Sequence, residues 1–420
     1  MDHHILTIDS ITGKGDGIAQ LDGQPVYIPR AASGDKLRVE VTTVKDNAHG
    51  RIIEMIEAGP DRVEAPCPHY AICGGCQMQH LSVAAYQAWK ENSVKELFIK
   101  AGVVPQKWQP TVFISEATRR RVTFAAFKRG QELTLGFNGS RSDQIANQEI
   151  CLLLTPALND LRNRMRPYLL KILPEGKLID VSLQDVDGAI ELILTGDFSD
   201  ISTARSQAVT DAVHGLGLAR IGWRATQFAE PEIWLQLSPV TKSFAKMVVT
   251  VPPASFLQPS REGEAALVAA VQAGCKGMKK ARFLDLFSGC GTFSGHLLAQ
   301  GEVHAVETDR PAVTALKNAI PYSRGLSVER RDLFKEPVTS RELNMYDCVV
   351  FDPPRAGAKA QAEIMAKAKT AKIIGVSCNP TSFITDAKIL MAGGYKLTSL
   401  QIVDQFIWST HSEVVGVFSR

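Results

Sequence analysis

Phe283-Leu-Asp-Leu-Phe-Ser-Gly-Cys-Gly-Thr292 is the stretch that decides the fold of the C-terminal half of this chain. Its apolar run predicts a buried strand, and the glycines after it let the backbone turn tightly and approach a ligand closely. The spacing is Asp-x-x-x-Gly-x-Gly, which differs from the Gly-x-Gly-x-x-Gly of dinucleotide-binding folds. Alone, this loop is explained as well by a structural turn as by a binding site.

Three later strands end in acidic residues and favour a binding site. The strand EVHAVE ends in Glu307, Asp332 lies near the end of the next short strand, and CVVF is followed by Asp352. Runs such as ARFLDLF and AKIIGVS alternate with helix-compatible stretches, which indicates a doubly wound parallel sheet. Ligands bind at the carboxyl ends of such strands, and Glu307 can accept hydrogen bonds from ribose hydroxyls. The pattern predicts an adenosyl-cofactor site, and the lack of a Walker phosphate loop suits S-adenosylmethionine.

A cysteine follows the next predicted strand, KIIGVS, in the element Cys378-Asn379-Pro380. Uridine C5 is a poor nucleophile, but addition of a thiolate to C6 lets C5 attack a methyl sulfonium. The C5 proton must then leave, which needs a general base, and His411-Ser-Glu413 is the best candidate. We expect Cys378 to be the nucleophile and Glu413 the base. The alternative is a small core cysteine and a surface glutamate.

The element Asp352-Pro-Pro-Arg355 narrows the substrate class. Enzymes that methylate exocyclic amino groups usually carry an aromatic residue after the two prolines, to stack the base, where this chain has Arg355. Cytosine-C5 methyltransferases place their nucleophilic cysteine within or beside this element, and this chain has none there.

Four cysteines precede the catalytic half of the chain, in the pattern Cys67-x5-Cys73-x2-Cys76 followed by Cys151. Structural disulfides are rare in cytoplasmic proteins. Four thiolates suit zinc or an iron–sulfur cluster, and the spacing alone does not choose between them.

The composition predicts a protein of two to three domains with no membrane helix. Of 420 residues, 45% are hydrophobic and 22% charged, and the N-terminus carries no signal-peptide pattern, so we expect a cytoplasmic location.

Short alternating strands over residues 5–58 indicate a small β-barrel. Residues 111–170 hold nine basic against five acidic residues. That excess predicts either a face that binds phosphates or an ordinary solvated surface.

These motifs together resemble the family of RNA 5-methyluridine methyltransferases, particularly its bacterial 23S ribosomal RNA uracil-C5 branch, over nearly the whole chain. The front, from Gly13-Lys-Gly-Asp-Gly-Ile-Ala19 to Gly34-Asp35-Lys-Leu37, resembles a TRAM domain. The resemblance implies an OB-like barrel at 1–60, a central α+β domain with a [4Fe-4S] cluster at 61–255 and a Rossmann-like methyltransferase domain at 256–420. It also implies that the helix near 82–101 packs on the catalytic domain.

The resemblance carries site residues onto this chain. As ligands of the cluster it implies Cys67, Cys73, Cys76 and Cys151. Around S-adenosylmethionine it implies, with the glycine loop, Gln258 of Phe256-Leu-Gln258, Phe287, Gly289, Gly291, Thr292, Glu307, Asp332 and Asp352. The Ser-Cys-Asn-Pro element implies Cys378 as nucleophile. The family's C-terminal pattern Asp-x-Phe-Pro-x-Thr-x-His-x-Glu is similar to Asp404–Glu413, with Ile407 in place of Pro, and implies Glu413 as the base.

Two other functions stay open. One is a tRNA 5-methyluridine methyltransferase with the same chemistry. The other is an iron–sulfur redox or radical enzyme acting on RNA, disfavoured because the cysteine spacing is not Cys-x3-Cys-x2-Cys. We expect an RNA partner, no membrane and no obligate protein partner.

Overall fold

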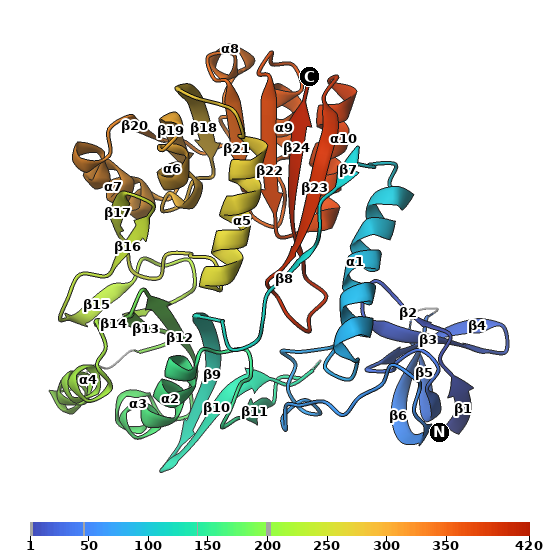
Figure 1. The fold of residues 1–420 in the computed structure, drawn as a ribbon. Coiled ribbons are helices and arrows are strands. Elements are labelled where there is room, and N and C mark those ends of the chain that lie inside the picture. The colour runs from blue at the N-terminus through green and yellow to red at the C-terminus, as the bar shows by residue number, and fades with distance from the viewer. Residues whose placement is uncertain (1–2, 45–46, 141, 199–202) are drawn as a thin grey trace.

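The computed structural model describes residues 3–44, 47–140, 142–198 and 203–420. Three large sheets follow one another along the chain, with a two-stranded hairpin before the last, and Figure 1 shows them from the blue N-terminus to the red C-terminus. None of the helices in the described ranges combines the length and apolarity needed to cross a bilayer.

The first sheet holds six strands in the order β1-β5-β6-β4-β3-β2. Its strands are β1 (His3–Thr7), β2 (Ser10–Ile11), β3 (Asp16–Leu21), β4 (Gln24–Pro29), β5 (Lys36–Val44) and β6 (Asn47–Glu57). Alternate residues such as Val26, Ile28, Leu37 and Val39 are buried in its own small core, as period-two strands require. Within the described residues, the pairing does not close between β1 and β2, so this sheet is a half-barrel where the sequence predicts a small β-barrel.

The central sheet holds seven strands, with helices packed on its core side. Its strands are β9 (Arg121–Arg129), β10 (Glu132–Asn138), β11 (Ile145–Asn147), β12 (Leu178–Val186), β13 (Ala189–Thr195), β14 (Arg220–Arg224) and β15 (Glu232–Gln236). The helices are α2 (Pro156–Arg164), α3 (Arg166–Ile172) and α4 (Thr203–Leu216). Only β13 and β14 pair in parallel, so this is a mainly antiparallel α+β unit.

The C-terminal sheet is doubly wound, as the sequence predicts. Its main order is β20-β19-β18-β21-β22-β24-β23-β7. The strands are β18 (Ala281–Leu286), β19 (Gly301–Glu307), β20 (Leu326–Arg330), β21 (Cys348–Phe351), β22 (Lys372–Ser377), β23 (Lys396–Asp404) and β24 (Glu413–Ser419), joined by the short β7 (Lys107–Trp108) and β8 (Val112–Phe113). β24 runs antiparallel to both β22 and β23.

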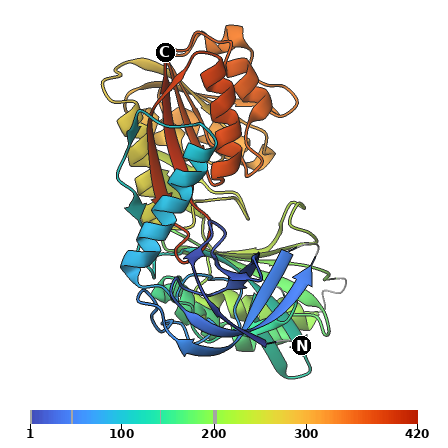
Figure 2. The ribbon, with the colours of Figure 1, turned by 90° about the vertical axis from the view of Figure 1, so that its right-hand side faces the viewer.

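Helices cover both faces of this sheet (Figures 1 and 2). Neighbouring residues of one strand enter different cores: Phe283 packs with α5 (Arg261–Gly274), α6 (Thr292–Leu297) and α7 (Arg310–Ala319). Leu284 faces α8 (Ser340–Leu343), α9 (Lys359–Met365) and α10 (Pro380–Ala392). Burial on both faces explains why these strands are apolar runs without polar alternation.

Part of the region 61–255 joins the C-terminal unit. Helix α1 (Val83–Lys100) runs along the C-terminal sheet in both ribbon views and buries Val94 and Phe98 in its core. The chain then adds β7 and β8 to β23, with Lys107 opposite Ser399 and Val112 opposite Val403. α1 therefore ties the front of the molecule to the catalytic half.

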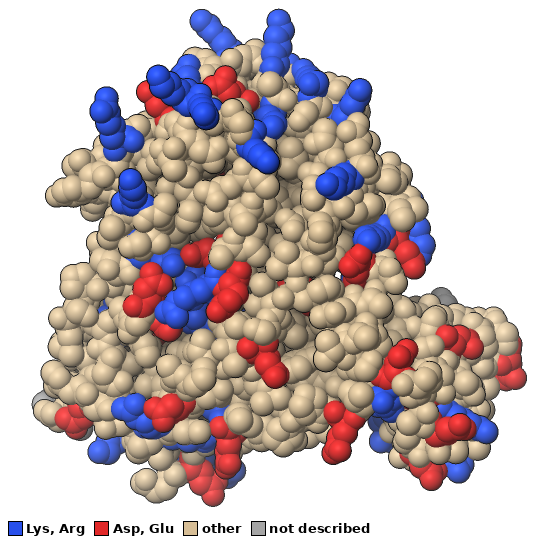
Figure 3. Space-filling view, in the orientation of Figure 1, with Lys and Arg blue, Asp and Glu red and all other residues tan. Residues whose placement is uncertain are grey.

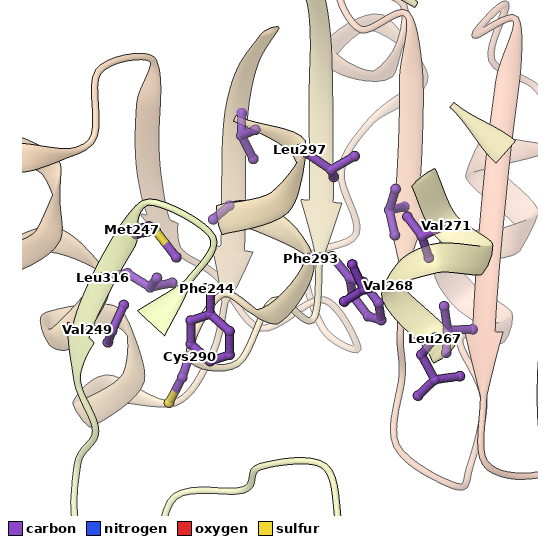
Figure 4. Packing of buried hydrophobic residues seen from close by; sticks show 14 of the residues in the cluster. Phe244, Met247, Val249, Leu267, Val268, Val271, Cys290, Phe293, Leu297 and Leu316 are labelled. Carbon is purple, nitrogen blue, oxygen red and sulfur yellow. The ribbon is translucent and has the colours of Figure 1, made fainter. Parts of the chain in front are cut away.

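A hairpin before this half, β16 (Thr241–Phe244) and β17 (Met247–Thr250), packs beside the glycine loop. Figure 4 shows Phe244 and Met247 from the hairpin close to Cys290 and Leu316, with Phe293 between them and α5. The loop is thus supported from behind by apolar side chains.

The basic excess over residues 111–170 is only partly exposed among the described residues, because two of its side chains are buried and four are half-buried. Arg120 and Arg162 are fully buried, and Arg129 and Arg164 are exposed. Arg141 lies outside the described residues. Figure 3 shows Lys and Arg gathered instead at the end of the molecule formed by the C-terminal sheet.

Candidate active site

A cavity of about 460 Å³ opens at the carboxyl ends of the C-terminal strands. Eight of the ten residues predicted for the cofactor and the chemistry line it: Gln258, Phe287, Gly289, Thr292, Glu307, Asp352, Cys378 and Glu413. They come from separate strand ends and from the segment before α5, which the parallel topology brings to one edge.

The glycine loop follows β18 and wraps one side of the cavity. Phe287, Gly289 and Gly291 have φ of 59°, 54° and 91°, in the left-handed region that favours glycine. Gly291 directly precedes α6 and does not line the cavity. A Cβ there would lie 2.6 Å from Met247 Cε and 2.7 Å from a Leu316 methyl. Its role is to let the loop lie close to the hairpin β16–β17.

Two carboxylates stabilise this loop. Asp285 is fully buried and accepts a 2.6 Å hydrogen bond from Ser294 Oγ, and burial raises its pKa to about 7. Glu307 Oε2 accepts from the Gly289 amide at 2.8 Å, while its Oε1 accepts from the amides of Thr308 and Asp309. Backbone amides therefore fix the orientation of the Glu307 carboxylate at the cavity wall.

Asp332 lies next to the cavity without lining it. Its carboxylate accepts from the Phe334 amide at 3.1 Å, and its neighbours Arg331, Leu333 and Phe334 form the wall. The Phe334 ring lies 5.6 Å from that of Phe287, so the two rings form an apolar side of the cavity. The resemblance implies Phe287 at this site, whereas no sequence pattern predicted Phe334.

Cys378 lies directly after β22, at the start of α10. Asn379 caps this helix by accepting from the Thr381 amide and donates to the Arg355 carbonyl at 2.9 Å, which ties the cysteine loop to the Asp-Pro-Pro-Arg element. Burial raises the pKa of the Cys378 thiol to about 11, with further increases from Glu413 and Asp352 that Arg355 partly offsets. The thiol needs a change in its surroundings, or a base, to react at neutral pH.

Glu413 is the first residue of β24. The antiparallel pair Ser377 and Val414 brings the end of β22 and the start of β24 to the same place, so Cys378 and Glu413 meet at one cavity. Glu413 is 3% exposed, and burial raises its pKa to about 7. A carboxyl group with this pKa can gain or lose a proton near neutral pH.

Gln405 connects the predicted base to the predicted cofactor residue. Its Nε2 donates to Glu413 Oε1 and to Gln258 Oε1, both at 2.9 Å. Gln258 is held from the other side by the buried Arg120, which donates to the Gln258 carbonyl at 3.0 Å and pairs with Glu264 at 2.7 Å. Gln405 could not be predicted from the sequence, because only the folded loop between β23 and β24 brings it to Glu413.

The four front cysteines line a second cavity, of about 450 Å³. Phe256, beside Gln258, lines both cavities. Burial raises the pKa of Cys67, Cys76 and Cys151, in the case of Cys76 to about 12, and the neighbouring thiols raise these values further. Over the parts of the chain that the structure describes, no group of three or more such side chains is placed to hold a metal ion.

Comparison with known proteins matches both ends of the chain to families. The family described as tRNA (Uracil-5-)-methyltransferase matches residues 241–420, and the TRAM domain matches residues 6–52. An uncharacterized RNA methyltransferase of Caulobacter vibrioides is 37% identical over 99% of both chains. The 23S rRNA (uracil(1939)-C(5))-methyltransferase RlmD of Shewanella denitrificans is 28% identical over 98% of this chain and 95% of its own.

A solved structure shows the same fold over the full length. The tRNA (uracil-54, C5)-methyltransferase of Pyrococcus abyssi, in complex with S-adenosyl-L-homocysteine, superposes with a TM-score of 0.77. It covers 99% of both chains at 21% identity. The full-length relative at 37% identity establishes that the chain belongs to the RNA methyltransferases, and the family match identifies residues 241–420 with the uracil-5-methyltransferase family.

Proposed function

We propose that this enzyme uses S-adenosylmethionine to methylate C5 of a uridine in RNA, with Cys378 as nucleophile and Glu413 as general base. The observation that carries the proposal is that Cys378 and Glu413 line the same cavity as the glycine loop and Glu307. This chemistry requires three features in one cavity: a thiol, a carboxyl group of pKa about 7, and a wall that can bind the nucleoside of the cofactor.

The lining residues fit the cofactor. Glu307 offers carboxylate oxygens to ribose hydroxyls, and Phe287 and Phe334 offer ring faces to an adenine. Gln258 adds an amide held in place by Gln405. When bound, S-adenosylmethionine supplies a methyl group on a positively charged sulfur.

The residues of this chain carry the remaining steps. The cavity receives a uridine splayed out of its stack. The Cys378 thiolate adds to C6, which makes C5 nucleophilic, and C5 then takes the methyl group. Glu413 removes the proton from C5, the C6–S bond breaks, and the Cys378 thiolate is restored.

We propose 23S ribosomal RNA as the substrate. The support is the TRAM match at residues 6–52 and full-length similarity to a relative named for 23S rRNA. The alternative is tRNA, because the full-length structural match is named for tRNA. Methylation of purified 23S rRNA and of unmodified tRNA transcripts, followed by mapping of 5-methyluridine, distinguishes them. Methylation of tRNA alone would reverse this assignment.

We also propose that Cys67, Cys73, Cys76 and Cys151 hold a [4Fe-4S] cluster. Four thiols fit such a cluster in number, and all four line one cavity. Binding would need their thiolate forms, whose mutual repulsion the cluster's iron would neutralise. The steps above need no electrons, so the cluster has a structural role. Protein purified without oxygen should contain iron and sulfide, and Cys151→Ser should lower both. Stoichiometric zinc without iron would contradict the proposal.

The test of the central proposal is covalent trapping. RNA with 5-fluorouridine at the target should form a stable complex with the enzyme, because fluorine cannot leave from C5 as a proton does. Cys378→Ser should form no complex, whereas Cys290→Ser, a thiol 3% exposed in the same cavity, should still form one. Methylation by Cys378→Ser at the wild-type rate would show that the nucleophile is wrong.

A further inference from the structure

The β23–β24 loop, residues 405–412, leads directly into Glu413 and is held by α1. Lys90 of α1 is fully buried. Its Nζ lies 3.1 Å from Asp404 Oδ1 and donates to the carbonyls of Ser409 at 2.8 Å and His411 at 2.5 Å. The ammonium group of Lys90 thus binds two carbonyls near the end of this loop and lies beside the carboxylate that precedes its start.

Tyr86, one turn earlier on α1, holds the middle of the loop. Its hydroxyl donates to Asp404 Oδ2 at 2.5 Å and accepts from the Trp408 amide at 2.9 Å. Trp408 has φ 56°, a left-handed conformation that costs a non-glycine residue of the order of 1 kcal/mol. Its carbonyl accepts from the amides of Gln77 and Met78. The strained backbone is thus fixed from both sides.

The contacts from α1 end next to the residues that touch the reacting groups. Asp404 directly precedes Gln405, which donates to Glu413, and His411 lies two residues before Glu413. Lys90 and Tyr86 are themselves absent from the cavity lining within the described residues. Replacing a buried ion pair with packed apolar side chains is often neutral for stability, so stability alone does not explain a lysine here.

We propose that Lys90 and Tyr86 are positioning residues, which hold the 405–412 loop so that Glu413 reaches the C5 proton. The inference rests on the proposed function. It separates two steps of the reaction: Cys378 follows β22 and lies outside the loop, so its addition to C6 does not depend on the contacts from α1, whereas proton removal depends on them through Glu413. Misplacing a reacting group by about 1 Å can cost about 100-fold in rate.

The experiment follows both halves in single turnover, on RNA tritiated at uridine C5. The covalent protein–RNA adduct is measured on denaturing gels, and tritium release reports removal of the C5 proton. Lys90→Met and Tyr86→Phe should form the adduct at the wild-type rate, but tritium release should slow by about 100-fold and about 10-fold, respectively. The methylated adduct should therefore accumulate, as it should in Glu413→Gln.

Lys100→Met is the matched control on the same helix. Its ammonium pairs with Glu96 at 2.9 Å, and its side chain is 76% exposed, so both rates should equal those of the wild type. Tyr86→Phe decides the question if Lys90→Met does not fold. Wild-type tritium release in folded Lys90→Met or Tyr86→Phe would overturn the inference, as would equal slowing of adduct formation and tritium release. Absence of any adduct in the wild-type protein is a different result and would refute the proposed function itself.

Discussion

Replacing Glu413 with glutamine should make the protein more stable while stopping its turnover. Burial raises the pKa of Glu413 from 4.5 to about 7 in the folded protein. A carboxyl group whose pKa is higher in the folded state adds stability below pH 4.5, and that stability is lost as the pH rises through 7. Ionised Glu413 therefore destabilises the fold at neutral and alkaline pH.

The size of the effect follows from the shift. One pKa unit corresponds to about 1.4 kcal/mol. The raised pKa of Glu413 therefore lowers the free energy of unfolding of the wild type by about 3 kcal/mol at pH 8.5 and by about 1 kcal/mol at pH 5.5. Glu413→Gln cannot ionise and keeps an oxygen to accept the hydrogen bond from Gln405. Its advantage in the free energy of unfolding should grow by about 2 kcal/mol over this pH range.

Urea unfolding of both proteins at the two pH values measures this difference. Glu363→Gln, an exposed carboxylate on α9, is the matched control and should stay within about 0.5 kcal/mol of the wild type. A stability difference that does not change with pH would refute the reasoning. So would a Glu413→Gln protein that loses stability, relative to the wild type, between pH 5.5 and 8.5.

Three further predictions follow from the site. Gly291→Ala, at φ 91° and with an atom 2.6 Å from the new Cβ, should lose about 2–3 kcal/mol of stability and bind S-adenosylhomocysteine more weakly in calorimetry. Gly289→Ala has open space around the new Cβ and should lose only about 1 kcal/mol. The single-turnover rate of tritium release should rise between pH 6 and 9, because Cys378, with a pKa of about 11, and Glu413, with a pKa of about 7, both act deprotonated; a fall in rate over this range would contradict both roles. Glu413→Gln should speed alkylation of the Cys378 peptide by iodoacetamide, because the Glu413 carboxylate raises the pKa of that thiol; unchanged or slower alkylation, measured by mass spectrometry, would contradict this coupling.

The strand-end residues could be predicted because one physical rule places them. In a parallel sheet, residues after β18, β19, β21 and β22 meet at one edge whatever the loops do. Glu307, Asp352 and Cys378 therefore line one cavity as their positions in the sequence indicate. Gly291 and Asp332 lie next to the cavity without lining it. This could not be predicted, because spacing does not say which residue of a loop turns inward.

The supporting residues could not be predicted, because their partners are distant in sequence. Tyr86 bonds Asp404 across 318 positions, and Arg120 reaches Glu264 across 144. The same pairing takes one residue of the central basic excess away from the surface. Arg120 is buried against the catalytic half, where it holds the backbone of Gln258. Counting charges along a chain assumes that each charge faces water.

The proposed roles of Cys378 and Glu413 need opposite protonation states of Glu413. The thiolate forms more readily when Glu413 is protonated, since the Glu413 carboxylate raises the pKa of Cys378. Proton removal from C5, in contrast, needs Glu413 ionised. A buried carboxyl group with a pKa of about 7 can occupy both states near neutral pH, which a glutamate at its ordinary pKa of 4.5 cannot. In the proposed mechanism, the burial that destabilises ionised Glu413 is part of the chemistry. It also gives a reason for the buried contacts by which Lys90 and Tyr86 hold Asp404, at the start of the loop that leads into Glu413.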